Sequence, residues 1–515
     1  MRNLLTSLSL LAFVSASYAV DTVAYGDWNS ATTWKDGVIP SGEGVSGTLN
    51  GNNCNDSQFY YFDTDTSASQ LNVGWSTGQY TIKSAGDNNP TFTLYGSNSA
   101  NGVICLRGGS GGTAAQTQRL TIESGNYSIV AGTAAADNYA RISLGSNSTS
   151  NPNIIKNLVF GSASNFTSSI SVYFDNMLAS WATNYSEDYT RRSSIDMNGK
   201  FSVDSAKSTN VRGVTLNVNG GSDVSIGQLN ISNYAVVNVN TAMSVKPTGL
   251  AAYSNNLYVA STGVLNVNDV LTITSVGSTH HLTIAGTVNV NDGGSIAAAG
   301  GYGTIQIATG GVLRLASAEN TVRADGVLRM GLGSRLILDS TNAYWGNFNP
   351  VRSKALWLSN GYGTTEQSTA FLDVNAYNQF SGFCFGTNRA NEVAPILTVT
   401  IGLSEGVALD LSQLTCTLDA VNYGYLMGEA KLIFVNFRNN AVKVGKEHEA
   451  QTVDGITYAD DFSLISAEGY EDFRLEKDVS GDFFWLTATA VPEPSCLTAM
   501  LGALALGFIV YRRRK

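Results

Sequence analysis

The chain has 515 residues and a formal net charge of −10, and only 14% of its residues are charged. Because the balance is acidic and no basic patch occurs outside the last few residues, the composition argues against nucleic acid as a partner. Hydrophobic residues make up 43% of the chain, enough for a sizeable core, and their regular Val/Leu/Ile alternation argues against disorder.

The first 19 residues have the three parts of a secretory signal peptide. Arg2 supplies the positive charge, residues 4–14 are apolar, and residues 17–19 fit the small–x–small rule for cleavage. We therefore expect cleavage after Ala19, with a mature chain that starts at Val20. Residues 1–19 are left out of the fold prediction.

Residues 20–99 are expected to form an N-terminal cap region. They contain the segment WNSATTW at 28–34, which resembles a short segment near the start of many bacterial autotransporter-like surface proteins. Its expected role is to cover the first open edge of a β-structure, since an exposed strand edge invites aggregation. The alternative is that Trp28 and Trp34 stack on sugars.

A repeat built on Asn-Val-Asn occupies the middle of the chain. Residues two apart in a strand share a face, so the apolar residues of each copy should point into a core and the asparagines outward. The predicted core pairs are Leu216 and Val218, Val237 and Val239, Leu265 and Val267, and Val288 and Val290. We expect the outward asparagines to stack as ladders.

The spacing of these copies favours a solenoid. They are offset by 21, 28 and 23 residues, and a period in this range with one alternating strand per unit is typical of a parallel β-helix. Each rung of such a fold stacks about 4.8 Å above the last. We assign residues 100–395 to the β-solenoid, with an antiparallel β-sandwich as the alternative.

Residues 396–490 carry more charge than the repeats. Alternating segments recur there at 432–435 and 483–486. We interpret this region as a C-terminal β cap, or a small β-domain, that hides the last edge of the solenoid.

The chain has 5 cysteines. Cys54, Cys105, Cys384 and Cys416 would lie in an oxidising compartment, where four cysteines allow three pairings. The sequence-local choice joins Cys54 to Cys105 and Cys384 to Cys416, and buried thiols are the alternative. No Cys-x-x-Cys spacing occurs, so zinc is not expected.

The sequence shows no catalytic constellation, and we assign no catalytic residue, cofactor or metal ligand. His280, His281 and His448 are the only histidines, and neither His-Glu-x-x-His nor Gly-x-Ser-x-Gly occurs. Asp460 and Asp461 are adjacent, so in a strand they would point to opposite faces rather than flank a sugar about 5–9 Å apart. The alternative functions are a polysaccharide lyase or hydrolase on a β-helix and a carbohydrate-binding protein.

Three consecutive parts end the chain: a stiff polar motif, an apolar segment at 497–511 and a basic cluster. Proline fixes φ and favours extended backbone, so the motif should be accessible. The apolar segment would make a helix of roughly 22 Å, which is short for a span unless arginines snorkel. We expect one C-terminal transmembrane helix with a cytoplasmic C-terminus. The motif and the basic cluster are Val491, Pro492, Glu493 and Pro494, and Arg512, Arg513, Arg514 and Lys515.

This order of parts resembles the PEP-CTERM sorting signal of Gram-negative bacteria, and the resemblance covers residues 491–515. It implies that an exosortase, a transpeptidase-like membrane protease, binds Pro-Glu-Pro transiently and processes the protein. It also implies export, anchoring in the inner membrane before processing, and then a place at the cell surface or in an extracellular matrix with exopolysaccharide or biofilm. The sequence thus predicts an exported all-β protein with a structural or adhesive role.

Overall fold

The computed structural model describes residues 18–491 with internal gaps, so the tail 492–515 and most of the predicted signal peptide lie outside the described residues. The gaps are 23–25, 44, 50–57, 75–77, 86–88, 97–102, 107–115, 134–138, 145–153, 177–192, 221–223, 250–253, 275–279, 300–303, 318–321, 325–327, 332, 346–354, 360–367, 381, 389–396, 412–424, 428–429, 445–450, 454–455, 459–462 and 464.

The described residues form an all-β fold, as predicted. They contain strands β1 to β47 and two short 3-10 helices, η1 (Ala31–Thr33) and η2 (Lys35–Gly37). The chain divides into two compact units, 1–224 and 225–515, and the division falls within β18 (Val224–Ile226). Each unit is described by itself.

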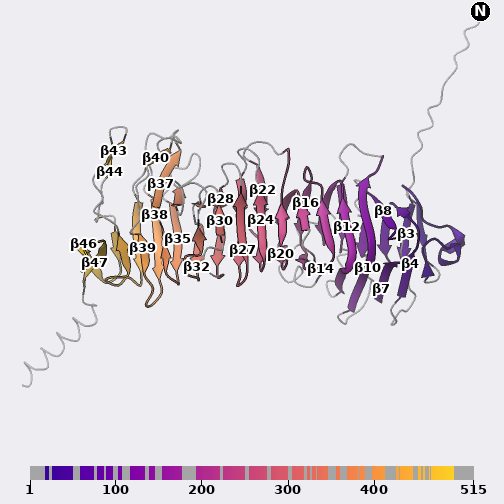
Figure 1. The fold of residues 1–515 in the computed structure, drawn as a ribbon, viewed down its shortest axis with the longest axis horizontal. Coiled ribbons are helices and arrows are strands. Elements are labelled where there is room, and N and C mark those ends of the chain that lie inside the picture. The colour runs from indigo at the N-terminus through magenta and orange to yellow at the C-terminus, as the bar shows by residue number, and fades with distance from the viewer. Residues whose placement is uncertain are drawn as a thin grey trace, which may run out of the picture. The chain divides into compact units, whose positions relative to one another are not determined.

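The first unit has three stacks of parallel strands, and its strands lie side by side in the ribbon of Figure 1. The first stack is β1 (Tyr18–Asp21), β3 (Val45–Leu49), β6 (Gln70–Val73), β9 (Ile104–Leu106), β11 (Tyr139–Ser143), β13 (Ser171–Asp175) and β16 (Ser208–Arg212). The second is β2 (Gly26–Asp27), β4 (Gln58–Phe62), β7 (Gly78–Ser84), β10 (Gln116–Ala131), β12 (Ile154–Ser168), β14 (Ser194–Met197) and β17 (Thr215–Val218). The third is β5 (Thr66–Ala68), β8 (Thr91–Gly96), the second halves of β10 and β12, and β15 (Lys200–Val203).

The strands β10 and β12 belong to two stacks because each turns a corner. Their register shifts between Ile122 and Ser124, and Gly125 has a φ of +105°, which L side chains rarely adopt. An added Cβ at Gly125 would also lie 3.0 Å from the ring of Phe62. Glycine is therefore required where the chain passes from one face to the next.

Aromatic side chains fill the core of the first unit. Trp28 and Trp34 are 0% and 1% exposed, with ring centroids 4.6 Å apart. A Cβ on Gly47 of β3 would lie 2.5 Å from the Trp28 ring, so this strand approaches the indole closely. The alternative that Trp28 and Trp34 stack on sugars is wrong, because both rings are buried against the first rungs.

The second unit repeats the plan of three stacks. The first is β19 (Gln228–Ser232), β22 (Asn255–Val259), β25 (His280–Ile284), β28 (Ile305–Ile307), β31 (Leu328–Met330), β34 (Ala355–Ser359) and β37 (Gly382–Asn388), with β40 (Tyr425–Met427) antiparallel to β37. The second is β20 (Val236–Val239), β23 (Val264–Val267), β26 (Thr287–Val290), β29 (Val312–Leu315), β32 (Arg335–Leu338), β35 (Ser368–Val374), β38 (Leu397–Leu403), β41 (Ala430–Val435) and β45 (Ile465–Ala467). The third is β21 (Met243–Val245), β24 (Val270–Thr274), β27 (Ser295–Ala299), β30 (Val322–Ala324) and β33 (Tyr344–Trp345), followed by β36 (Asn378–Gln379), β39 (Leu409–Leu411) and β42 (Val442–Val444).

Parallel pairing between successive turns is consistent with a β-helix or solenoid within each unit, and inconsistent with the antiparallel sandwich. A turn passes through three stacks of strands rather than the one that the repeat suggested. Some turns have the predicted length, with side chains 21, 28 and 23 residues apart in adjacent rungs. Others are longer, with separations of 36 and 39 residues. Parallel strand pairs also occur before residue 100 and after residue 395. The domain boundaries predicted at these residues stay predictions.

The predicted register of the Asn-Val-Asn repeats is confirmed. The eight apolar residues are 0–1% exposed, and the first asparagine of each copy is half-buried on the outer face. In the second unit, Val267 stacks in register between Val239 and Val290. These columns of Val and Leu form the core.

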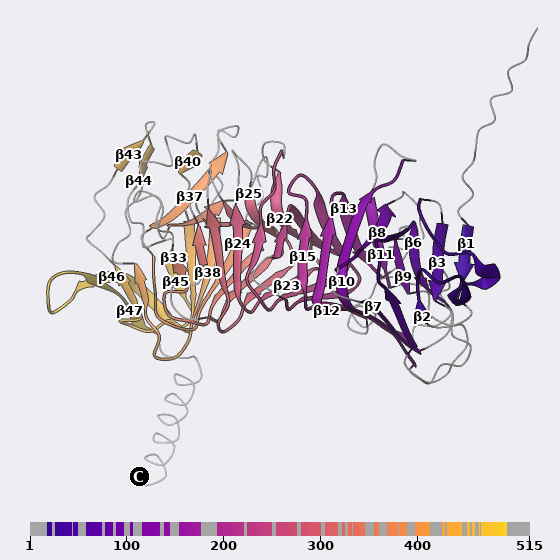
Figure 2. The same cartoon turned by 45° about the vertical axis from the view of Figure 1, so that its right-hand side comes forward.

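Antiparallel strands follow the last parallel rungs of the second unit. The strands β46 (Tyr470–Lys477) and β47 (Phe484–Ala490), labelled in Figure 2, pair with each other, and β47 also pairs with β42. A separate hairpin joins β43 (Gln451–Val453) to β44 (Ile456–Tyr458). Within the described ranges no helix has the length and apolar character needed to cross a bilayer, and the predicted helix at 497–511 falls outside those ranges.

Candidate functional site

Val491 is the first residue of the predicted sorting motif and the last residue that the structure describes. Val491 follows β47, is 39% exposed, and donates its backbone N–H to the carbonyl of Gly469 at 2.8 Å. This bond fixes the backbone one residue ahead of Pro492. Pro492, Glu493 and Pro494 themselves lie outside the described residues, as do Arg512, Arg513, Arg514 and Lys515.

The predicted cleavage site lies in the first strand. Ala19 is the second residue of β1 and pairs in register with Ser46 of β3. Cleavage after Ala19 would leave Val20 and Asp21 to pair with Gly47 and Thr48. The position of the cleavage site stays a prediction.

The outer face of the second stack carries hydrogen-bonded ladders of asparagine in the second unit. Asn289 donates to Asn266, and Asn266 donates to Asn238, at 2.9 and 2.8 Å. A second ladder, two residues further along each strand, joins Asn291 to Asn268 and Asn268 to Asn240. Asn266 and Asn268 each donate one bond and accept another, so the ladders link successive rungs without net charge.

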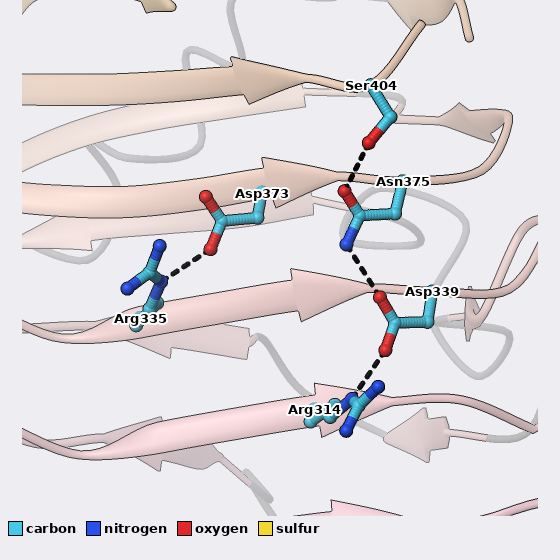
Figure 3. Close-up of polar contacts among 6 residues, drawn as sticks. All are labelled: Arg314, Arg335, Asp339, Asp373, Asn375 and Ser404. Atoms are coloured by element: carbon cyan, nitrogen blue, oxygen red, sulfur yellow. Dashed lines mark hydrogen bonds and ion pairs between the residues drawn. The ribbon is translucent and has the colours of Figure 1, made fainter.

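Further along the same stack, charged side chains replace the amides (Figure 3). Arg314 pairs with Asp339, Asn375 donates to the other carboxylate oxygen of Asp339, and Ser404 donates to Asn375. Arg335 pairs separately with Asp373 of the next rung. The arginines are about half exposed, so these links align successive rungs and contribute modestly to stability.

His280 and His281 are adjacent residues of β25. His281 is buried, with Nε2 3.0 Å from the carbonyl oxygen of Ala299. Burial, followed by the positive charge of Arg329, lowers the pKa of the His280 imidazole. His448, Asp460 and Asp461 lie outside the described residues. In the parts of the chain that the structure describes, no group of three His, Cys, Asp or Glu side chains is arranged to hold a metal ion.

The predicted cysteine pairing stays a prediction. Cys105 is buried in β9 and Cys384 lies in β37. Cys54 and Cys416 lie outside the described residues.

The structure brings together a charged cluster that the sequence did not predict. Arg141 of β11, Asp175 of β13 and Arg212 of β16 lie on three successive strands of the first stack of the first unit. The Asp175 carboxylate is 0% exposed and pairs with Arg212, and its Oδ2 lies 3.7 Å from Nε of Arg141. We call these three residues the arginine cluster.

Two tyrosine rings flank the arginine cluster. The guanidinium of Arg212 lies 4.8 Å from the ring centroid of Tyr173, and that of Arg141 lies 5.7 Å from the ring centroid of Tyr139. The two rings meet edge to face at 5.0 Å. Cation–π contacts of this kind hold the guanidinium groups in place.

Sequence analysis missed the arginine cluster because its members are far apart in the chain. Arg212 and Asp175 are 37 residues apart, well beyond the period of the Asn-Val-Asn repeats. The available signal was the alternation in each strand, where a charged residue follows an apolar one at 140–141, 174–175 and 211–212. Aligning these strands requires the longer turns, which the short period concealed.

In comparisons with protein families, with curated proteins and with solved structures, none matched this chain.

Proposed function

We propose that this chain is an exported structural or adhesive protein of the cell surface or extracellular matrix, sorted through residues 491–515. The observation that carries the proposal is the tail itself, in which Pro492-Glu493-Pro494 precedes an apolar segment and a basic cluster. The position of Val491 supports it. Val491, the first residue of the motif, directly follows β47 and is 39% exposed, as a motif that a protease must reach requires.

We also infer that each unit is a segment of a β-solenoid that serves as a scaffold. A scaffold needs a repeating core and an outer face that can hydrogen-bond to glycans and to neighbouring molecules. Stacked Val and Leu columns supply the first requirement, and uncharged asparagine ladders supply the second.

Binding of a glycan is the second candidate function, and it rests on the exposed aromatic rings of β4. Phe59 and Tyr61 are 47% and 38% exposed, and residues two apart share a face of the strand. Exposed aromatic rings can stack on apolar faces of a ligand. This candidate is compatible with a matrix protein.

Replacing Glu493 with Ala tests the sorting proposal. If an exosortase reads Pro-Glu-Pro, the variant should accumulate as full-length protein in the inner-membrane fraction, while the parent reaches the cell surface. Glu468→Ala is the matched control, because Glu468 is an exposed glutamate of the folded body. Fractionation followed by immunoblotting reports the outcome, and equal surface delivery of the Glu493 variant and the parent would refute the proposal.

A further inference from the structure

Arg141 is buried with hydrogen-bonding capacity left over. Its side chain is 3% exposed, and its Nε and Nη1 have no hydrogen-bond partner within the part of the chain that the structure describes. The 3.7 Å separation between its Nε and Oδ2 of Asp175 is too long for a hydrogen bond. Buried donors in folded proteins are normally satisfied by protein, water or an ion, so an acceptor is needed beside Arg141.

The arginine cluster also carries an excess positive charge. Among the described residues it sets two guanidinium groups, of Arg141 and Arg212, around the single carboxylate of Asp175. Nε of Arg212 is likewise buried without a hydrogen-bond partner among those residues. An uncompensated charge is strongly unfavourable away from water, and one monovalent anion would balance it.

We propose that the arginine cluster binds the carboxylate group of a ligand. A guanidinium presents its N–H groups in a planar fork that matches the two oxygens of a carboxylate. Both guanidinium groups lie beside the Asp175 carboxylate and keep buried donors without a partner among the described residues. A carboxylate also carries one negative charge, which would balance the excess charge counted among the described residues. A doubly charged phosphate would overcompensate that excess.

Two sources can supply this carboxylate: an acidic sugar of a polysaccharide, or a free small carboxylic acid. The first source rests on the proposed matrix function, and the carboxylate site itself does not. The rings of Tyr139 and Tyr173 are only half-buried, so they form the side of the cluster nearest solvent. A sugar ring attached to the bound carboxylate would lie against them.

Isothermal titration calorimetry on the purified full-length chain in mild detergent tests the proposal. The probes are sodium acetate, sodium glucuronate, polygalacturonate and, as the neutral control, glucose. We expect acetate and glucuronate to bind saturably at one site per chain, and glucose to give no saturable heat. Tighter binding of glucuronate and polygalacturonate than of acetate identifies a sugar acid as the ligand, whereas equal affinities identify a free small carboxylate.

Variants separate binding by the cluster from other sources of heat. Arg141→Gln should weaken carboxylate binding by roughly tenfold to a hundredfold, as expected for the loss of charge-assisted hydrogen bonds. Arg335→Gln is the matched control, because Arg335 also pairs with an aspartate and lies 5.9 Å from the centroid of an aromatic ring, but is 51% exposed. It should bind acetate like the parent.

Further variants cover the case in which Arg141→Gln does not fold, as judged by circular dichroism. Arg141→Lys keeps the charge without the planar fork, and Arg212→Gln removes the other arginine. Each should weaken binding. Absence of saturable carboxylate binding to the parent, or unchanged affinity in these variants, would overturn the proposal and leave water as the partner of Arg141. This result is independent of where the protein is delivered, so failure of the site and failure of the sorting proposal are distinguishable.

Discussion

Replacing Val267 with Asp should destabilise the second unit far more than replacing its neighbour Asn266 with Asp. Val267 is 0% exposed and stacks between Val239 and Val290, which are also 0% exposed. Removing a fully buried Val forfeits about 1.5–3 kcal/mol. Placing a carboxyl group there adds several kcal/mol more, because no partner charge lies in this column. The total loss is on the order of 5 kcal/mol.

The Asn266→Asp substitution should lower the free energy of unfolding much less. The amide of Asn266 donates to Asn238 and accepts from Asn289. Asp keeps the acceptor, and its charge strengthens the bond from Asn289. Only the donated bond is lost, which costs about 0.5–1.5 kcal/mol, so the two substitutions should differ by roughly 4 kcal/mol.

Thermal melts and urea titrations of both variants, followed by circular dichroism, measure this difference. Solenoids need not unfold in a single two-state step, so the midpoint of the transition that the variant shifts is the quantity to compare. A clearly lower midpoint for Val267→Asp than for Asn266→Asp is expected. Equal shifts would mean that these side chains do not occupy different faces, and the register would be wrong.

Two further predictions concern the first unit. Gly125→Ala should lower the melting temperature of the first unit more than Gly42→Ala does. Both glycines have positive φ, but only Gly125 has a neighbour, Phe62, within 3.0 Å of the added Cβ. Similar shifts would show that the corner tolerates a side chain. Burial lowers the pKa of Lys156 to about 8, with Cys105 acting in the opposite direction. The pKa of Lys in the unfolded chain is near 10.5, so between about pH 8 and about pH 10 the folded state holds fewer protons than the unfolded chain. The free energy of unfolding should therefore rise over this range by up to roughly 3 kcal/mol. Lys156→Met should flatten this rise in urea midpoints, and identical pH slopes in parent and variant would rule the titration out.

The sequence was most informative where alternation is strict and turns are short. Leu265 and Val267 identified the inner face correctly, and Asn266 identified the outer ladder. In a strand that alternates with a period of two, the apolar residues can lie only on one face or the other. The apolar pattern does not show how many strands each turn contains. Strands such as β24 and β27 lack the Asn-Val-Asn motif, as does the 16-residue β10.

The arginine cluster and the burial of the tryptophans depend on contacts between residues that are far apart in the chain. Arg141, Asp175 and Arg212 meet only because turns of different length bring their strands into register. We expected Trp28 to cover the first strand edge, with stacking on a sugar as the alternative, and the close approach of Gly47 shows that the ring is buried. Loops of variable length are tolerated at little cost in free energy. Local sequence therefore predicts neither which strands meet at the arginine cluster nor which strand covers Trp28.

Mass spectrometry of the C-terminal peptide of the protein recovered from the cell surface tests the central claim most directly. If the tail is a sorting signal, the surface form should lack Arg512–Lys515, and its last peptide should end near Pro492-Glu493-Pro494. Recovery of surface protein whose last peptide ends at Lys515 would contradict the account.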